Sequence, residues 1–444
     1  MRIQSIAASG LFGSFNHELR FQADEPVTVM TGPNGVGKTT LLRMINALFN
    51  HLPSLGQFPF SKLAVHFDDG AYLVAERKRS AGPEKQHFRL SVSGCSAGGP
   101  PRAFEVDLQA EPRELGILAS AAEEFLPDLD RVGPRQWLYR PTGEILSLSE
   151  VYERFGDELP GAGMEPSLKI PDWFRDITKA TPVRLVDTER LTRPRSPRPA
   201  SVRPARQVAG RTILRYSREL AQQAQKVLAE YGAVSQSLDR SFPARLVRNK
   251  AGSRTGVELR AQLDEVEKKR RQLVSVGLLA KDSDWGVGVP SLEDLDDSQR
   301  SVLGMYVEDA VGKMEVFKDL YARVVKLTTI ANSRLLQKHL TAGRDGFVVA
   351  SSDGSNLNLE LLSSGEQHEI VLLYELLFCA EKDSLILIDE PELSLNVEWQ
   401  EQFLGDLVEI SKASGFQALL ATHSPQIIGD RWDLTSQLSA PGPR

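Results

Sequence analysis

The eight residues from Gly32 to Thr39, Gly-Pro-Asn-Gly-Val-Gly-Lys-Thr, constrain the fold of this chain more than any other stretch. They satisfy the phosphate-loop pattern, in which two glycines five positions apart are followed by Lys and Thr. The apolar residues 27–30 before them predict a buried strand, and we expect a helix to begin at Lys38. A chance glycine-rich turn is the alternative, and this strand–loop–helix context argues against it.

A loop of this kind binds phosphates for physical reasons. Its glycines let backbone N–H groups converge on the β- and γ-phosphates, and the following helix points its positive end at them. Lys38 adds a mobile positive charge, and the Thr39 hydroxyl is placed to bind Mg²⁺. We therefore predict a nucleotide-phosphate site with Mg²⁺, formed by Gly32, Asn34, Gly35, Gly37, Lys38, Thr39 and Thr40.

Three further stretches lie far downstream. Residues 362–367 read Leu-Ser-Ser-Gly-Glu-Gln, residues 385–390 read Leu-Ile-Leu-Ile-Asp-Glu, and residues 419–424 read Leu-Leu-Ala-Thr-His-Ser. The second stretch predicts a strand with Asp389 and Glu390 at its carboxyl end, where parallel α/β sheets carry their chemistry. Two adjacent acids are often only a solvated pair, but four aliphatic residues precede this pair and Pro391 follows it.

Taken together, the phosphate loop and these three stretches resemble the ABC-type ATPases of the SMC, RecF and OLD kind. The resemblance implies that Asp389 belongs to the Mg²⁺ shell, that Glu390 polarises the attacking water, and that His423 senses the γ-phosphate. The resemblance also implies a catalytic as well as a binding role for Lys38. Glu189 stands where relatives carry a metal-contacting Gln, so it is either a metal ligand or a surface residue.

The same resemblance implies that the chain works as more than one copy. The signature residues Ser363, Ser364, Gly365 and Glu366 would cap the γ-phosphate held by a second copy, with residues 392–396 as a dimer-contact loop. We therefore expect two ATP molecules sandwiched in a homodimer, which is either the complete assembly or part of a higher oligomer.

The expected fold class is α/β, an ABC-type ATPase with a mixed central sheet, an antiparallel β layer and an inserted helical region. A hairpin over residues 62–77, turning at Asp68-Asp69-Gly70, predicts part of the antiparallel layer. We expect an N-terminal ATPase lobe over 1–190, an Arg/Pro-rich linker with a short coiled-coil insertion over 191–340, and a C-terminal ATPase lobe over 341–444.

Three local predictions accompany this division. Residues 79–101, rich in Gly, Ser and Pro, predict a long loop. Residues 191–211 carry many Arg and Pro and no acid, which favours either a solvated linker or a segment that contacts nucleic acid. Apolar stripes at helical spacing predict helices after residue 212, the first of them ending at Pro243.

Composition excludes several classes. A net charge of −6 argues against a chain that coats nucleic acid indiscriminately, and two cysteines make neither a disulfide framework nor a zinc site. No apolar run is long enough to span a membrane and no signal peptide is visible, so we expect no membrane partner and a cytoplasmic location.

Only 21 residues follow His423 in this sequence, so we expect the chain to lack the Toprim nuclease that OLD-type nucleases carry. It is also similar to the stand-alone ATPases of bacterial anti-phage modules such as Septu and PARIS, which work with a separately encoded nuclease or toxin. We therefore expect a regulatory ATPase triggered by DNA or a phage protein. A DNA-repair ATPase of the RecF/SMC kind is the alternative. An ABC transporter motor fits less well, because a long helical stretch precedes the signature.

Overall fold

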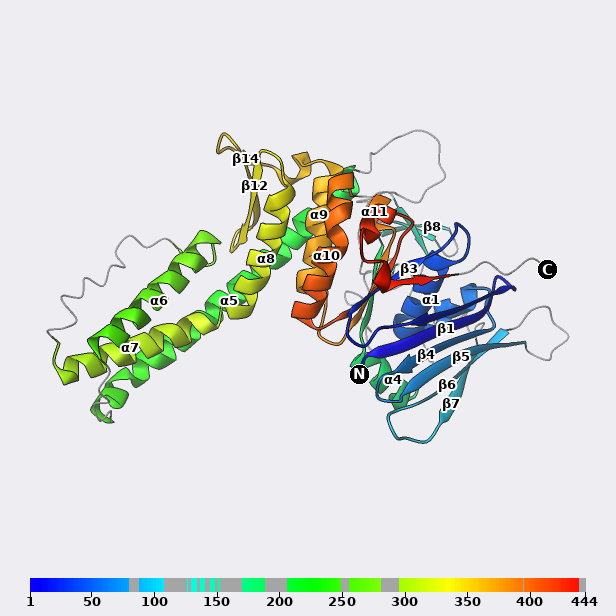
Figure 1. The fold of residues 1–444 in the computed structure, drawn as a ribbon, viewed down its shortest axis with the longest axis horizontal. Coiled ribbons are helices and arrows are strands. Elements are labelled where there is room, and N and C mark those ends of the chain that lie inside the picture. The colour runs from blue at the N-terminus through cyan, green and yellow to red at the C-terminus, as the bar shows by residue number, and fades with distance from the viewer. Residues whose placement is uncertain are drawn as a thin grey trace. The chain divides into compact units, whose positions relative to one another are not determined.

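The computed structural model describes residues 1–79, 88–107, 126, 129–133, 136–139, 144–147, 151, 170–187, 206–248, 255–280, 295–393 and 395–438. Two compact units divide the chain: residues 1–209 with 375–444, and residues 210–374 (Figure 1). This is a different division from the predicted lobes, because the second unit keeps the signature together with the helices. Glu189 and residues 191–205 lie outside the described residues.

A parallel sheet lies at the centre of the first unit. Its described strands run in the order β11-β15-β16-β3-β17. They are β11 (Val183–Asp187), β15 (Leu385–Asp389), β16 (Gln417–Ala421), β3 (Val27–Thr31) and β17 (Thr435–Gln437). The fold class is α/β, as predicted. We expected a mixed central sheet, but all four pairings among these strands are parallel.

Alternate residues of the central strands face two different layers. Leu385 and Leu387 of β15 belong to one large core, in which α1 (Lys38–Asn50) packs its apolar face. Ile386 and Ile388 are buried as well but lie outside that core, on the opposite face, where α10 (Val397–Ser414) buries its own apolar residues. Because both faces are covered, the strand is a continuous apolar run.

The large core also includes the predicted antiparallel layer, a sheet in the order β2-β1-β4-β5-β6-β7. Its strands are β1 (Ile3–Leu11), β2 (Phe15–Arg20), β4 (Lys62–Phe67), β5 (Tyr72–Arg79), β6 (Phe88–Cys95) and β7 (Arg102–Asp107). The helix α4 (Asp172–Ala180) packs Trp173 and Phe174 into the same core. A 3₁₀ turn (Leu52–Gln57) follows α1, and a small sheet contains β8 (Leu129–Gly133), β9 (Gln136–Tyr139) and β10 (Glu144–Ser147).

The loop prediction for residues 79–101 was wrong over β6. Leu90 and Val92 are fully buried, and the strand pairs with both β5 and β7. Gly94 suggested a loop, but it serves close packing, since a Cβ there would lie 2.6 Å from the carbonyl oxygen of Tyr72 and 2.8 Å from the ring of Trp173.

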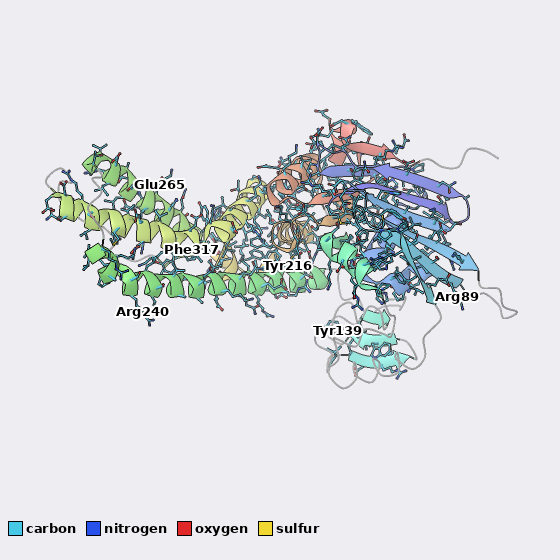
Figure 2. The ribbon with its side chains drawn as sticks, turned by 90° about the horizontal axis from the view of Figure 1, so that it is seen from below. Arg89, Tyr139, Tyr216, Arg240, Glu265 and Phe317 are labelled. Atoms are coloured by element: carbon cyan, nitrogen blue, oxygen red, sulfur yellow. The ribbon has the colours of Figure 1, made fainter. Side chains whose placement is uncertain are left out.

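The described part of the second unit is built on four long helices, the first of which begins just before it: α5 (Arg206–Arg248), α6 (Gly256–Ser275), α7 (Asp297–Glu315) and α8 (Lys318–Arg334). Figure 2 shows Tyr216 and Arg240 along α5, Glu265 on α6 and Phe317 between α7 and α8. The prediction that the first helix ends at Pro243 was wrong, because α5 continues through this proline to Arg248. Its residues from Arg206 are helical, although they were assigned to the linker.

A three-stranded sheet and the signature helix complete this unit. The strands are β12 (Lys338–Gly343), β13 (Gly346–Ser351) and β14 (Asn356–Leu357), and a 3₁₀ turn (Leu359–Leu361) leads to α9 (Ser364–Tyr374). The strand β13 pairs antiparallel with both β12 and β14. Tyr374 of α9 stacks on Tyr216 of α5 at 4.5 Å between ring centroids, which fixes the signature helix to the long helix.

The first unit also contains several short helical elements. A π-helical turn (Glu375–Cys379) follows α9 directly in the chain, and a 3₁₀ turn (Pro391–Leu393) follows β15. The helix α11 (Pro425–Ile428) and a 3₁₀ turn (Trp432–Leu434) lead into β17. Within the part of the chain that is described, no helix is long and apolar enough to cross a membrane.

Candidate nucleotide site

The phosphate loop connects β3 to α1, as predicted, and its glycines are required by geometry. Gly37 is the N-cap residue of α1 with φ of 100°, and a Cβ there would lie 2.6 Å from Cδ2 of Leu11. Gly37 has no side chain, so none caps the first turn of α1 from this position. The N–H groups of that turn therefore remain suited to an anion.

Lys38 points back over the loop. Its Nζ donates to the carbonyl oxygens of Gly32 at 2.9 Å and Pro33 at 3.2 Å, and it lies 3.4 Å from Nδ1 of His423. Burial lowers the pKa of Lys38, while the charges of Glu390, Asp389 and Glu392 partly oppose that effect. The Lys38 ammonium group is thus held in a partly buried position, where the negative charge of a phosphate would stabilise it.

Thr39 and Asp389 lie together although 350 residues separate them. The Thr39 hydroxyl donates to Oδ1 of Asp389 at 3.1 Å. A hydroxyl and a carboxylate are oxygen ligands of the kind that Mg²⁺ takes, with phosphate oxygens and water completing its shell. Among the described residues, no cluster of three or more His, Cys, Asp and Glu side chains could hold a metal ion. The oxygen ligands of Thr39 and Asp389 fit a cation that is bound jointly with a nucleotide.

Glu390 follows β15 in a backbone conformation that is rare for residues other than glycine, with φ of 44°. Its N–H donates to the carbonyl of Ala421, at the end of the neighbouring strand β16. Oε1 of Glu390 lies 3.6 Å from Nε2 of His423. The acid and the imidazole therefore face each other at the carboxyl edge of the sheet.

Glu392 is a site residue whose individual role was not foreseen. Its Oε1 accepts from the backbone N–H of His423 at 2.7 Å, which connects the turn after β15 to the turn after β16. Gln400 of α10 donates to the Glu392 carbonyl at 3.3 Å and accepts from the Ser424 hydroxyl at 2.9 Å. Asn396, in the predicted contact loop, caps α10 by accepting from the N–H of Trp399.

His17 was also missed. It is buried on β2, and its Nε2 donates to the carbonyl of Val36 inside the phosphate loop at 2.8 Å. The only sequence signal was the alternation of β2, which turns His17 and Leu19 to the same buried face.

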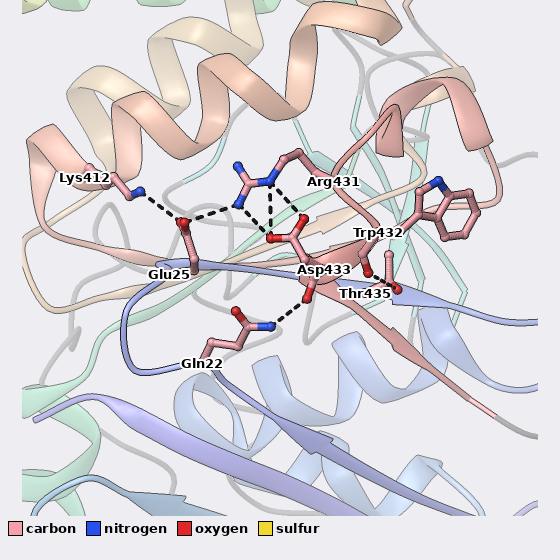
Figure 3. A network of polar contacts seen from close by, with 7 residues as sticks. All are labelled: Gln22, Glu25, Lys412, Arg431, Trp432, Asp433 and Thr435. Atoms are coloured by element: carbon pink, nitrogen blue, oxygen red, sulfur yellow. Dashed lines mark hydrogen bonds and ion pairs between the residues drawn. The ribbon is translucent and has the colours of Figure 1, made fainter.

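A polar network secures the segment that follows His423 (Figure 3). Glu25 pairs with Lys412 at 3.0 Å and with Arg431 at 3.2 Å, and Arg431 also pairs with Asp433 at 3.0 Å. Gln22 donates to the Asp433 carbonyl at 2.7 Å. The contacts tie this segment to the chain before β3 and to α10.

The secured segment continues into β17, beside the phosphate loop. The N–H of Leu438 donates to the Thr31 carbonyl at 2.8 Å. The Leu438 carbonyl oxygen would lie 2.8 Å from a Cβ on Gly32. Gly32 is thus needed for the close approach of these two backbones.

The signature lies in the second unit, at the start of α9. Ser363 and Glu366 form a reciprocal cap, in which the Ser363 N–H donates to Oε2 of Glu366 at 2.7 Å and the Glu366 N–H donates to the Ser363 hydroxyl at 3.3 Å. Lys338 of β12 pairs with both carboxylate oxygens of Glu366, at 2.7 and 2.9 Å. Burial alone would raise the pKa of Glu366, but the bonds from Lys338 and Ser363 lower it below its ordinary value.

The signature is anchored by buried polar side chains as well. Gln367 is fully buried and donates to three carbonyls, those of Leu359, Glu360 and Leu362. Arg334 of α8 pairs with Glu369 of α9, and both side chains are almost wholly buried. Ser363 and Ser364 remain exposed to solvent.

The structure thus brings Lys38, Thr39, Asp389, Glu390 and His423 together in the first unit. Residues 192–429, more than half of the chain, match the family described as "AAA domain, putative AbiEii toxin, Type IV TA system". The chain belongs to this AAA-domain family. A second model, described as an AAA domain, matches residues 11–91 and so includes the phosphate loop. The chain is accordingly an ATPase of this broad class.

Structural similarity was found to SMC head domains. One is the Smc head domain with an extended coiled coil bound to the C-terminal domain of ScpA from Pyrococcus furiosus, at 13% identity and a TM-score of 0.34, covering 97% of this chain and 91% of that chain. The SMC head domain from Thermotoga maritima gives 13% identity and a TM-score of 0.34, covering 99% and 95%. No curated protein matches the chain.

Proposed function

We propose that the chain binds ATP with Mg²⁺ and hydrolyses it in a site completed by a second copy of itself. The observation that carries this proposal is the convergence of Lys38, the Thr39–Asp389 pair, Glu390 and His423 at the carboxyl edge of one parallel sheet.

Each residue has a role in this proposal. Lys38 neutralises phosphate charge, and the N–H groups of the loop and of α1 orient the phosphates. Thr39 and Asp389 hold Mg²⁺, which when bound neutralises the charge that develops on the phosphoryl group. Glu390 accepts a proton from the attacking water, and His423 donates a hydrogen bond to the γ-phosphate.

The homodimer rests on the exposure and rigidity of the signature. Ser363 and Ser364 face solvent at the N-terminus of α9, where N–H groups suit a phosphate. Lys338 neutralises the Glu366 carboxylate, which lies beside these two serines. The paired carboxylate therefore does not repel an incoming γ-phosphate as an unpaired carboxylate would.

We further propose that the chain is the ATPase subunit of an anti-phage defence complex. It would respond to a trigger, either DNA or a phage protein, and control a separately encoded nuclease or toxin. The family description, which names a putative AbiEii toxin and a type IV TA system, supports a defence setting. A DNA-repair clamp of the RecF/SMC kind is the second candidate, and the long helices α5–α8 before the signature favour it.

Replacing Glu390 by Gln tests the hydrolysis proposal, because it keeps the shape of the side chain but removes the base. We expect ATP binding to persist while phosphate release falls by about 100-fold or more. Glu398→Gln is the matched control, since it removes an exposed acid from the first turn of α10. Unchanged turnover in Glu390→Gln would contradict the assignment of Glu390 as the base.

Purification of the chain from its native operon tests the partner proposal. We expect a second protein from the same locus to copurify, and the chain alone to leave DNA and RNA intact. Mg²⁺-dependent cleavage by the isolated chain, unaltered in Glu390→Gln, contradicts the proposal.

A further inference from the structure

The imidazole of His423 lies between two charged side chains of the nucleotide site. Nζ of Lys38 is 3.4 Å from its Nδ1, and Oε1 of Glu390 is 3.6 Å from its Nε2. An ammonium group can only donate, so Nδ1 is the acceptor and the neutral ring carries its proton on Nε2. A hydrogen bond from Nε2 to a γ-phosphate therefore requires the ring to keep this orientation.

The backbone of His423 is held by a side chain from the neighbouring turn. Its N–H donates to Oε1 of Glu392 at 2.7 Å. Hydrogen bonds to an ionised acceptor are roughly twice as strong as bonds between neutral groups. The second oxygen, Oε2 of Glu392, is buried and has no hydrogen-bond partner among the described residues. Within that part of the chain, the carboxylate is thus devoted to the backbone of His423.

Gln400 of α10 holds both ends of this bond in place. Its side chain is buried, and its amide nitrogen donates to the carbonyl oxygens of Glu392 at 3.3 Å and Leu395 at 3.0 Å. Its Oε1 accepts from the hydroxyl of Ser424, the residue after His423, at 2.9 Å. The bond between Glu392 and His423 therefore joins two turns that are themselves fixed to the same helix.

We propose that Glu392 is a positioning residue for hydrolysis, which fixes the backbone of His423 so that the imidazole reaches the γ-phosphate. This inference rests on the proposed function, in which His423 donates a hydrogen bond to that phosphate. A misplacement of about 1 Å in a reacting site can cost roughly 100-fold in rate. A side chain that holds only the backbone of His423 can therefore control turnover.

The alternative is that Glu392 only braces two turns of the fold. Two substitutions separate the roles. Glu392→Gln keeps an oxygen that accepts from the His423 N–H, whereas Glu392→Ala removes it. The bond lies at the surface, so water can accept from this N–H in Glu392→Ala, and we expect the variant to fold. Circular dichroism melting checks that each variant is folded.

A double-mutant cycle in the full chain shows whether Glu392 acts through the imidazole. We expect Glu392→Ala to lower kcat by about ten-fold or more, and Glu392→Gln to stay within about three-fold of the wild type. His423→Ala keeps the backbone bond but removes the imidazole. Adding Glu392→Ala to it should lower kcat by no more than about two-fold further. Glu401→Ala, which removes an exposed acid of α10, is the control and should keep the wild-type rate.

Hydrogen exchange of one backbone amide tests the position of His423 without any turnover. Labelling histidine with ¹⁵N gives one amide signal for each of the seven histidines, and His423→Ala identifies the signal of His423. That amide should exchange at least about ten-fold faster in Glu392→Ala than in the wild type, and within about three-fold of the wild type in Glu392→Gln.

The two measurements separate this proposal from the proposed hydrolysis. Equal exchange of the His423 amide in Glu392→Ala and the wild type overturns the positioning role, and so do losses in kcat that multiply in the double variant. A wild type that releases no phosphate from ATP contradicts the proposed hydrolysis instead. The exchange rates then still decide whether Glu392 fixes the backbone of His423.

Discussion

At the scale of single residues, Glu390 has the most informative backbone. A positive φ at a residue other than glycine costs about 1–3 kcal/mol and persists only where the surrounding structure requires it. Here the N–H of Glu390 bonds the end of β16, and its carboxylate faces His423. We infer that the strain is retained because it directs this acid toward the phosphate loop.

Glu366 gives a pH-dependent prediction at the same scale. Its folded pKa is lowered from the ordinary 4.5, so its stabilisation is fully present above pH 4.5 and is lost as the pH falls through the lowered pKa. Lys338→Met removes the ammonium and should lower the free energy of unfolding at about pH 7. The difference from wild type should shrink at an acidic pH below this lowered pKa.

Urea unfolding at both pH values measures this difference. Lys318→Met is the control, because Lys318 pairs with Glu315 on the exposed surface and should contribute little. A stability difference for Lys338→Met that stays constant across the range contradicts the assignment.

At the scale of elements, secondary structure was predicted best where a sequence motif requires a particular backbone conformation. The strand before Gly32, the helix from Lys38 and the strand ending at Asp389 are present as expected, because a phosphate loop demands that context. The site roles of these residues stay predictions. The metal-binding role considered for Glu189 also stays a prediction, since this residue lies outside the described part of the chain.

Prediction failed where tertiary packing overrides local preference. Gly94 suggested a loop, yet it allows β6 to approach Trp173 closely. Pro243 suggested a break, yet α5 continues past it, and Arg245, two positions later, bonds Asp309 of α7. His17 and Glu392 carried little sequence signal, because their partners are backbone groups of distant loops.

The buried pair between α8 and α9 gives a prediction about stability. Arg334→Met leaves the Glu369 carboxylate buried without this partner, which should cost about 3–5 kcal/mol. The double variant Arg334→Met with Glu369→Leu should recover most of the loss, because apolar groups then replace both charges. Arg323→Met, which removes an exposed arginine of α8, is the control in urea unfolding. A double variant no more stable than the single one contradicts this account.

At the scale of the whole molecule, the central claim is that one copy supplies the phosphate loop and another supplies the signature. The two belong to different compact units of the chain, residues 1–209 with 375–444 and residues 210–374. Lys38→Ala should remove nucleotide binding by the loop, and Gly365→Asp should place a negative charge where the signature meets a γ-phosphate.

Mixing these two inactive variants tests the claim most directly. In a heterodimer, one site carries both changes and the other carries neither. Random exchange at equal concentrations should therefore restore about a quarter of the wild-type rate of phosphate release. If the mixture stays as inactive as its components while the copies exchange, or if Gly365→Asp alone retains full activity, the site is not shared between two copies.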